Sequence, residues 1–257
     1  CSIFFDATGT TAQSTGIPFH ELEYSWNFGD VNAGTWAETG RSKNTATGPL
    51  AAHVYERPGT YLVNVAVADR TVRATSQVTL TITDPTTVFS GTNTICFSRV
   101  GDFTGCPAGA LQITTTAFSS IAAQINPGKR LLFKRGETWT GATIAMQDAG
   151  PGTIGAYGTC LTPDARGICA NNPKFTSASF NFAPLSSSSR SGILTFDWRF
   201  MDLDMEGGGN AFESAGETKD ILILRVHTAN RNRAVLLGAG SMTLAAGHQP
   251  HDGVAIV

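Results

Sequence analysis

The sequence has little charge and no long apolar run. Asp, Glu, Lys and Arg make up 15% of its 257 residues, and the formal net charge is -2. A protein that binds nucleic acid through its phosphates needs a basic surface, which this composition does not supply. No run approaches the ~18 apolar residues of a membrane-spanning helix. We therefore expect neither a nucleic-acid partner nor a membrane span.

Several catalytic motifs are also missing. The sequence contains no Gly-x-Ser-x-Gly elbow, phosphate-cradling loop, nucleotide fingerprint or Cys-x-x-Cys pair. These absences argue against the reactions and the zinc sites that such motifs support. The run Gly207-Gly208-Gly209-Asn210 predicts a bend between sheet faces, because no helical pattern follows it.

The start of the chain lacks an initiator Met and an apolar secretion signal, so we expect a piece processed or cut from a longer protein. Its first residue is Cys1. This cysteine is a lipid-carrying residue, the partner of a cysteine outside this sequence, or an accident of where the chain was cut. Because Ile3-Phe4-Phe5 predicts a strand and leaves no flexible tether, the last two interpretations are favoured.

The other four cysteines fall into two close pairs. Cys96 lies near Cys106, Cys160 lies near Cys169, and each pair brackets loop sequence rich in Gly or Pro. This spacing predicts two local disulfides and an oxidising compartment. Buried free thiols in an intracellular protein are the alternative.

The composition and patterning favour strands over helices. Gly is abundant at 28 residues, and Val, Ile and Phe alternate with small polar residues. Period-2 alternation recurs up to about residue 84, as in Tyr24, Trp26 and Phe28 and again from Tyr61 to Val67. Turn signals separate these segments. We predict an all-β chain whose first domain, residues 1–84, is a compact antiparallel sandwich.

Four segments of this region resemble the PKD domain family. They are Phe5-Asp6-Ala7, Trp26-Asn27-Phe28-Gly29-Asp30, His53-Val54-Tyr55 and Pro58-Gly59-Thr60-Tyr61, in the family's order and spacing. The resemblance implies an immunoglobulin-like module of surface proteins and of secreted polysaccharide- or protein-degrading enzymes. Such modules act as spacers, adhesion units or weak ligand binders. The alternation itself predicts Trp26 and Tyr61 as core aromatics rather than a sugar platform.

The resemblance also implies a candidate calcium site, since some members of the family bind calcium near these loops. Asp6 and Asp30 are the candidate metal ligands. In the alternative, Asp30 closes its own turn by accepting backbone N–H bonds without a metal.

A different pattern follows the linker predicted at residues 85–92. Residues 93–257 contain short strands separated by Gly-, Ser- and Asn-rich connections, and Phe200–Met205 aligns with Ile223–Thr228 at an offset of 23 residues. This period predicts a β-solenoid. A further turn at Val254-Ala255-Ile256-Val257 extends it, and further C-terminal turns are expected to be missing or replaced by a stacked subunit.

The 23-residue offset fixes a register. Met201 and Leu203 are predicted to stack on Leu224 and Val226 inside the coil. On the outer face, about one strand spacing (~4.8 Å) separates acidic from basic side chains, namely Asp202 from Arg225 and Asp204 from His227.

Two more segments, Pro127–Trp139 and Gly152–Gly158, look like the opening turns of right-handed parallel β-helix proteins of the pectate-lyase-like superfamily. This scaffold serves lyases, hydrolases, epimerases, adhesins and phage spikes, so the resemblance implies a fold rather than a reaction. Residues 119–124 predict a short helix over the first open edge of the coil.

The outer face of residues 202–233 carries the candidate functional site. Enzymes of this fold need a base beside a neutralised uronate, or paired carboxylates. The candidate catalytic residues are Asp202, Asp204, Arg225 and His227, and the candidate glycan-binding residues are Glu206, Arg231 and Arg233. A solvated face on which acids offset bases is the alternative, and it is favoured. His248-Gln249-Pro250-His251-Asp252 is a weaker candidate for a metal or a general base, because Pro250 and Gly253 predict a turn.

Three functions follow from these features. The first is a non-catalytic surface or matrix module that binds extracellular polysaccharide, adheres or assembles; the lack of a convincing acid–base pair favours it. The second is a polysaccharide lyase or glycoside hydrolase. The third is a subunit of an extracellular filament, paired with copies of itself through the exposed end of the β-helix. All three predict a secreted or cell-surface protein, and no cofactor beyond the candidate calcium is implied.

Overall fold

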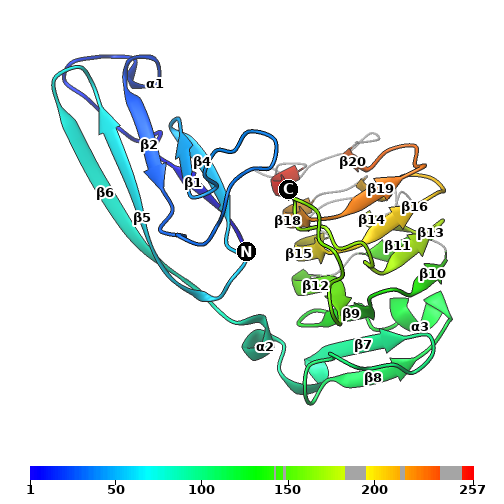
Figure 1. Cartoon of the computed structure of the whole chain (residues 1–257). Coiled ribbons are helices and arrows are strands. Elements are labelled where there is room, and N and C mark those ends of the chain that lie inside the picture. The colour runs from blue at the N-terminus through cyan, green and yellow to red at the C-terminus, as the bar shows by residue number, and fades with distance from the viewer. Residues whose placement is uncertain (142, 147–148, 183–194, 215–217, 238–250) are drawn as a thin grey trace. The chain divides into compact units, whose positions relative to one another are not determined.

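The computed structural model describes residues 1–141, 143–146, 149–182, 195–214, 218–237 and 251–257. The chain divides into two units, Cys1–Thr87 and Val88–Val257. Antiparallel sheets form the first unit, and long parallel sheets form the second (Figure 1). The predicted all-β architecture, a PKD-type sandwich followed by a parallel β-helix, is confirmed.

Two antiparallel sheets make up the first unit. The smaller pairs β1 (Ser2–Asp6) with β4 (Leu50–Val54). The larger has the order β3 (Thr45–Thr47), β2 (Glu23–Asn27), β5 (Gly59–Ala68) and β6 (Arg73–Ile82). A short helix, α1 (Pro18–Glu21), precedes β2.

The alternation in the sequence determines which side chains enter the sandwich core. Phe5, Trp26, Phe28, Tyr55 and Val63 form its buried cluster, and Tyr61 packs against them. Trp26 donates its indole N–H to the Gly48 carbonyl oxygen at 2.8 Å. Trp26 and Tyr61 are therefore core aromatics, as predicted.

Gly29 occupies a turn that no other residue fits. Its φ is +72°, and a Cβ there would lie 2.5 Å from the carbonyl oxygen of Leu62. The left-handed backbone and the close approach together require glycine.

Three parallel sheets make up the second unit. Ahead of them lie α2 (Pro85–Val88) and a 3₁₀ turn, η1 (Gly91–Asn93). The largest sheet has the order β21 (His251–Ile256), β18 (Thr218–Leu224), β15 (Thr195–Met201), β12 (Ala149–Tyr157), β9 (Arg130–Lys134), β7 (Thr94–Ser98) and β8 (Leu111–Thr114). The second has the order β10 (Thr138–Thr140), β13 (Lys174–Thr176), β16 (Asp204–Glu206) and β19 (His227–Ala229). The third has the order β11 (Thr143–Met146), β14 (Ser179–Phe182), β17 (Phe212–Ser214) and β20 (Val235–Leu237).

From β9 onward, successive turns of the chain place one strand in each sheet, which makes the unit a parallel β-helix with three faces (Figure 1). Phe200 pairs with Ile223 and Asp204 with His227, so the predicted 23-residue offset is confirmed on two faces. The predicted further turn is also present, because Ile221 pairs with Val254. That pair is 254 − 221 = 33 residues apart, since the connections differ in length.

A cluster of buried residues, here called the coil core, fills the β-helix and includes Phe133, Trp139, Phe175, Phe200 and Phe212. Their rings form a chain of edge and tilted contacts, such as 4.9 Å between the centroids of Phe133 and Phe175. The predicted helix is present as α3 (Phe118–Ala122), and its Ile121 belongs to the coil core.

The side chains that β15 and β18 turn into the interior differ from the prediction. Met201 and Leu224 pair with each other as expected, yet neither belongs to the coil core, which instead contains Phe200 and Ile223. The reason lies at the next residue of each strand. Asp202 and Arg225 have φ values of +59° and +51°. A left-handed residue breaks the period-2 alternation, so Leu203 enters the core three positions after Phe200 rather than two.

Candidate functional site

The outer face of the second sheet carries two rows of side chains, here called the polar ladder. Three of the four strands, β10, β13 and β16, turn their middle residues Trp139, Phe175 and Met205 into the coil core. The flanking residues therefore lie on the outer face. In register across the four strands, one row is Thr138, Lys174, Asp204 and His227, and the other is Thr140, Thr176, Glu206 and Ala229.

Ion pairs join neighbouring rungs of the polar ladder. His227 Nδ1 lies 2.9 Å from Asp204 Oδ1. Lys174 Nζ lies 2.7 Å from Glu206 Oε2 and 3.8 Å from Asp204 Oδ2. The hydrogen bond from Lys174 holds the pKa of the Glu206 carboxyl below its usual value, and the same bond raises the pKa of Lys174. Each acid of the ladder therefore faces a base.

A second group of charges, here called the corner cluster, lies where the chain turns from the first sheet to the second. Arg225 donates to Asp202 through Nε at 2.7 Å and through Nη2 at 3.1 Å. Arg135 Nη2 lies 3.7 Å from Asp202 Oδ2. Side-chain exposures of 10% for Arg135, 15% for Asp202 and 17% for Arg225 show that the three charges are largely buried. Burial lowers the pKa of Arg135, and the nearby Arg225 lowers it further, whereas Asp202 acts in the opposite direction.

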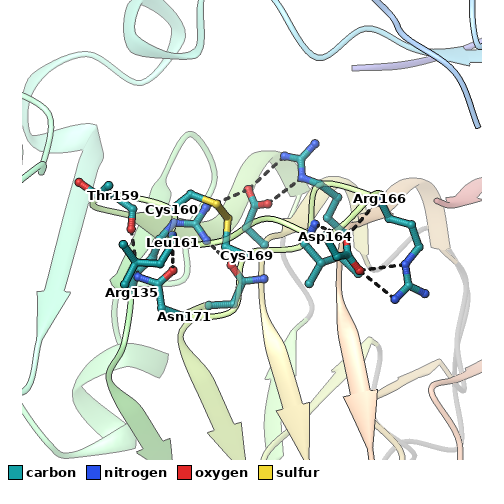
Figure 2. Close-up of a disulfide and its surroundings, with 12 residues drawn as sticks. Arg135, Thr159, Cys160, Leu161, Asp164, Arg166, Cys169 and Asn171 are labelled. Carbon is teal, nitrogen blue, oxygen red and sulfur yellow. Dashed lines mark hydrogen bonds and ion pairs between the residues drawn. A yellow bond between two sulfur atoms is a disulfide. The ribbon is translucent and has the colours of Figure 1, made fainter. Parts of the chain in front are cut away.

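The loop of residues 158–173 has an internal framework. Cys160 and Cys169 form a disulfide, with Thr159, Leu161 and Asn171 around it and Asp164 and Arg166 farther along the loop (Figure 2). The Asn171 side chain accepts a bond from the Leu161 amide at 2.9 Å and donates to the Thr159 carbonyl oxygen at 3.0 Å.

This loop also contacts the corner cluster. Arg135 donates to the Oδ1 atom of Asn172, which is buried. Gly167, with φ of +82°, lies so close to Arg225 that an added Cβ would be 3.3 Å from the Arg225 Cδ atom. The disulfide loop therefore covers part of the corner cluster.

The other disulfide braces the outer face of the first sheet. Cys96 and Cys106 are bonded, and both belong to or pack against a small buried cluster with Leu132 and Tyr157. Both disulfides predicted from the sequence are thus present. Cys1 belongs to neither bond, and its terminal ammonium group donates to the Tyr55 carbonyl oxygen at 2.6 Å.

Arg231 and Arg233 lie apart from the polar ladder's ion pairs. Arg231 donates to the Phe175 carbonyl oxygen at 3.2 Å, and burial lowers its pKa. Its Nε and Nη1 atoms are buried and have no hydrogen-bond partner among the described residues. Arg233 is exposed. Their assignment as glycan-binding residues stays a prediction.

The two acids of the candidate calcium site each have a protein partner. Asp30 is buried, and its Oδ2 lies 3.0 Å from Nε2 of the buried His53, whose ring stacks on Phe28. Asp6 Oδ1 accepts the Thr8 amide at 2.7 Å, and hydrogen bonds with the Thr8 side chain and with this amide lower the Asp6 pKa. Across the described ranges, no group of three or more His, Cys, Asp or Glu side chains is placed to hold a metal ion. Calcium binding stays a prediction.

The motif at residues 248–252 falls partly outside the described residues. Residues 248–250 are not described. His251 and Asp252 begin β21, where they pair with Thr218 and Lys219, so these two positions form a strand rather than the predicted turn.

The structure brings together the predicted residues Asp202, Asp204, Glu206, Arg225 and His227 and adds three that sequence reasoning missed. These three are Arg135, Asn172 and Lys174, which come from earlier turns of the chain. Arg135 precedes Asp202 by 67 residues (202 − 135) and Asn172 precedes it by 30 (202 − 172). Lys174 precedes its paired residue Asp204 by 30 (204 − 174). No repeat at the 23-residue period points to them. The signal that existed was the resemblance of Pro127–Trp139 to an opening turn, which contains Arg135.

Residues 7–82 match the PKD domain family. No match was found among curated proteins or among solved structures. Within the described ranges, none of the helices is long and apolar enough to span a membrane. PKD domains are typical of extracellular and cell-surface proteins, and the two disulfides agree with that setting.

Proposed function

We propose that this chain is an extracellular glycan-binding module, in which the PKD unit acts as a spacer or adhesion unit and the β-helix binds polysaccharide along the polar ladder. The in-register rows of polar side chains on four parallel strands carry this proposal. Rungs of a parallel sheet repeat every ~4.8 Å, so the ladder offers regularly spaced donors and acceptors to an extended polar polymer. The resemblance of residues 127–139 and 152–158 to pectate-lyase-like proteins supports a polysaccharide as that polymer.

The charge pairing supports binding over hydrolysis. A glycoside hydrolase needs a carboxylic acid whose pKa is raised so that it donates a proton. Glu206 has a lowered pKa, because Lys174 stabilises its ionised form. His227 nevertheless remains about half exposed, at 52%, and Lys174 is 39% exposed, so both offer donors to a ligand at the surface.

Binding is tested with the whole chain against a panel of uronate-containing and neutral polysaccharides by affinity electrophoresis and calorimetry. We expect at least one glycan to bind, and the double variant Lys174→Ala/His227→Ala to weaken that binding about tenfold, as loss of two surface donors predicts. Arg41→Ala, which removes an exposed cation from the other unit, is the matched control and should bind normally. Unchanged binding by the double variant would contradict the proposal.

A lyase activity is the second candidate, and the corner cluster is the observation that favours it. Abstraction of a proton next to a uronate carboxylate needs a base such as Lys or Arg, and this cluster brings Arg135 and Arg225 together around Asp202. The same panel is therefore followed for absorbance of unsaturated products and for new reducing ends. Product formation that Arg225→Ala or Asp204→Ala abolishes would establish an enzyme in place of a binding module.

A further inference from the structure

Strand β6 is an edge strand without the usual protection. It lies at the end of the larger sheet of the first unit, and all ten of its residues pair in unbroken register with β5. Natural edge strands avoid pairing with other chains through charged residues, Pro or bulges. Residues 74–82 of β6 contain no charged residue, no Pro and no bulge. Its outer backbone donors and acceptors are therefore available to another extended strand.

Both faces of β6 are exposed over most of its length. Arg73 to Thr79 are all exposed, and Val78 is 47% exposed. Val78 is in phase with Leu80 and Ile82, which pack against the sandwich core, so its side lies toward the smaller sheet. That sheet has only two described strands, which leaves this part of β6 uncovered. A partner strand thus gains side-chain contacts as well as backbone bonds.

The charges at the two ends of β6 select the orientation of that partner. Exposed Arg73 begins the strand, and exposed Asp84 follows its end. Parallel pairing of two copies would bring like charges together, whereas antiparallel pairing brings Arg73 of each copy close to the partner's Asp84. The uncharged run of residues 74–82 is centred on Val78, so a twofold axis at Val78 aligns the two runs fully.

From these features we propose that two copies of this chain associate through antiparallel pairing of their β6 strands, which joins the two larger sheets into one. A twofold axis perpendicular to the sheet keeps equivalent faces on the same side. Val78 then opposes the partner's Val78, and Gln77 opposes the partner's Thr79. Thr75 and the partner's Thr81 form a further cross-strand pair of a kind that stabilises sheets. This association goes beyond glycan binding, because it uses no residue of the β-helix.

The register gives a specific test by sedimentation velocity over a concentration series of the whole chain. We expect a monomer–dimer equilibrium. The double variant Gln77→Lys/Thr79→Lys places lysine against lysine at two positions of the dimer and should raise the dissociation constant at least tenfold. The double variant Gln77→Glu/Thr79→Glu should do the same. Both sites are exposed, so circular dichroism should show unchanged folding.

Mixing the two variants restores opposite charges across the interface, and we expect dimers to reappear as heterodimers. Amide exchange of β6 in the wild-type chain should also slow as protein concentration rises. A wild-type chain that remains monomeric to about 1 mM overturns the proposal. Dimers that persist unchanged in the lysine variant, or a mixture that does not recover, overturn it as well.

Discussion

Arg225 and Asp202 are joined by two hydrogen bonds, of 2.7 and 3.1 Å, across one 23-residue turn of the β-helix. Both residues also have a left-handed backbone. The corner that turns the chain from one sheet to the next thus also places a largely buried cation against a largely buried anion.

Replacing Asp202 by Ala should destabilise the β-helix unit by about 3–5 kcal/mol, because it leaves Arg135 and Arg225 largely buried without their shared anion. Urea unfolding of the variant measures this loss. The control is Glu206→Gln on the exposed polar ladder, where no measurable change is expected, since exposed ion pairs contribute little. Similar losses in both variants would contradict the buried role of Asp202.

Removing one disulfide should loosen the loop over the corner cluster. In the variant Cys160→Ser/Cys169→Ser, amide exchange should rise across residues 158–173, and the free energy of unfolding should fall by about 2–4 kcal/mol. Hydrogen-exchange mass spectrometry locates the effect. The variant Cys96→Ser/Cys106→Ser should leave exchange in residues 160–171 unchanged, because that bond packs with Leu132 and Tyr157, and its loop approaches the second loop only at Gly158.

Asp102 should contribute to the loss of folding stability in acid. The ammonium group of Lys134, 2.9 Å away, and the amide of Thr104 lower the Asp102 pKa from 3.8 to about 2. A lowered pKa in the folded state adds stability that is present above the unfolded value and lost as the pH falls through the folded value. Between pH 4 and pH 2, the free energy of unfolding should therefore fall less steeply in Asp102→Asn than in the wild type. Equal slopes in urea titrations over this window would show that Asp102 contributes nothing.

Two glycines of the first unit separate backbone strain from steric overlap. Gly29 and Gly34 have almost the same φ, +72° and +73°, but an added Cβ meets the Leu62 carbonyl oxygen at 2.5 Å only at Gly29. Gly34→Ala should cost about 1–2 kcal/mol, from the left-handed backbone alone. Gly29→Ala should cost more, because the backbone must also shift. Thermal unfolding of the two variants gives the comparison, and equal losses would mean that the turn at Gly29 relaxes freely.

Much of the fold could be predicted because it depends on short-range periodicity. Alternation at Tyr24, Trp26 and Phe28 marks a strand with one buried face, and each of these side chains is buried. The 23-residue offset predicted the pairing of Asp204 with His227, because equivalent residues of adjacent turns stack one strand spacing apart. Residue type and spacing alone are enough to predict these relationships.

The tertiary structure decided the rest. The hydrophobic pattern around Met201 does not reveal the sign of φ at Asp202, and that sign sets which residues enter the coil core. Arg135 and Lys174 reach the site through longer turns, because paired residues are 36 apart between β10 and β13 (174 − 138) and 30 apart between β13 and β16 (204 − 174). Neither offset equals the 23-residue period. The length of a turn does not by itself show which residues of the two strands pair with each other. Sequence spacing could therefore identify the acids of this site but not all of their partners.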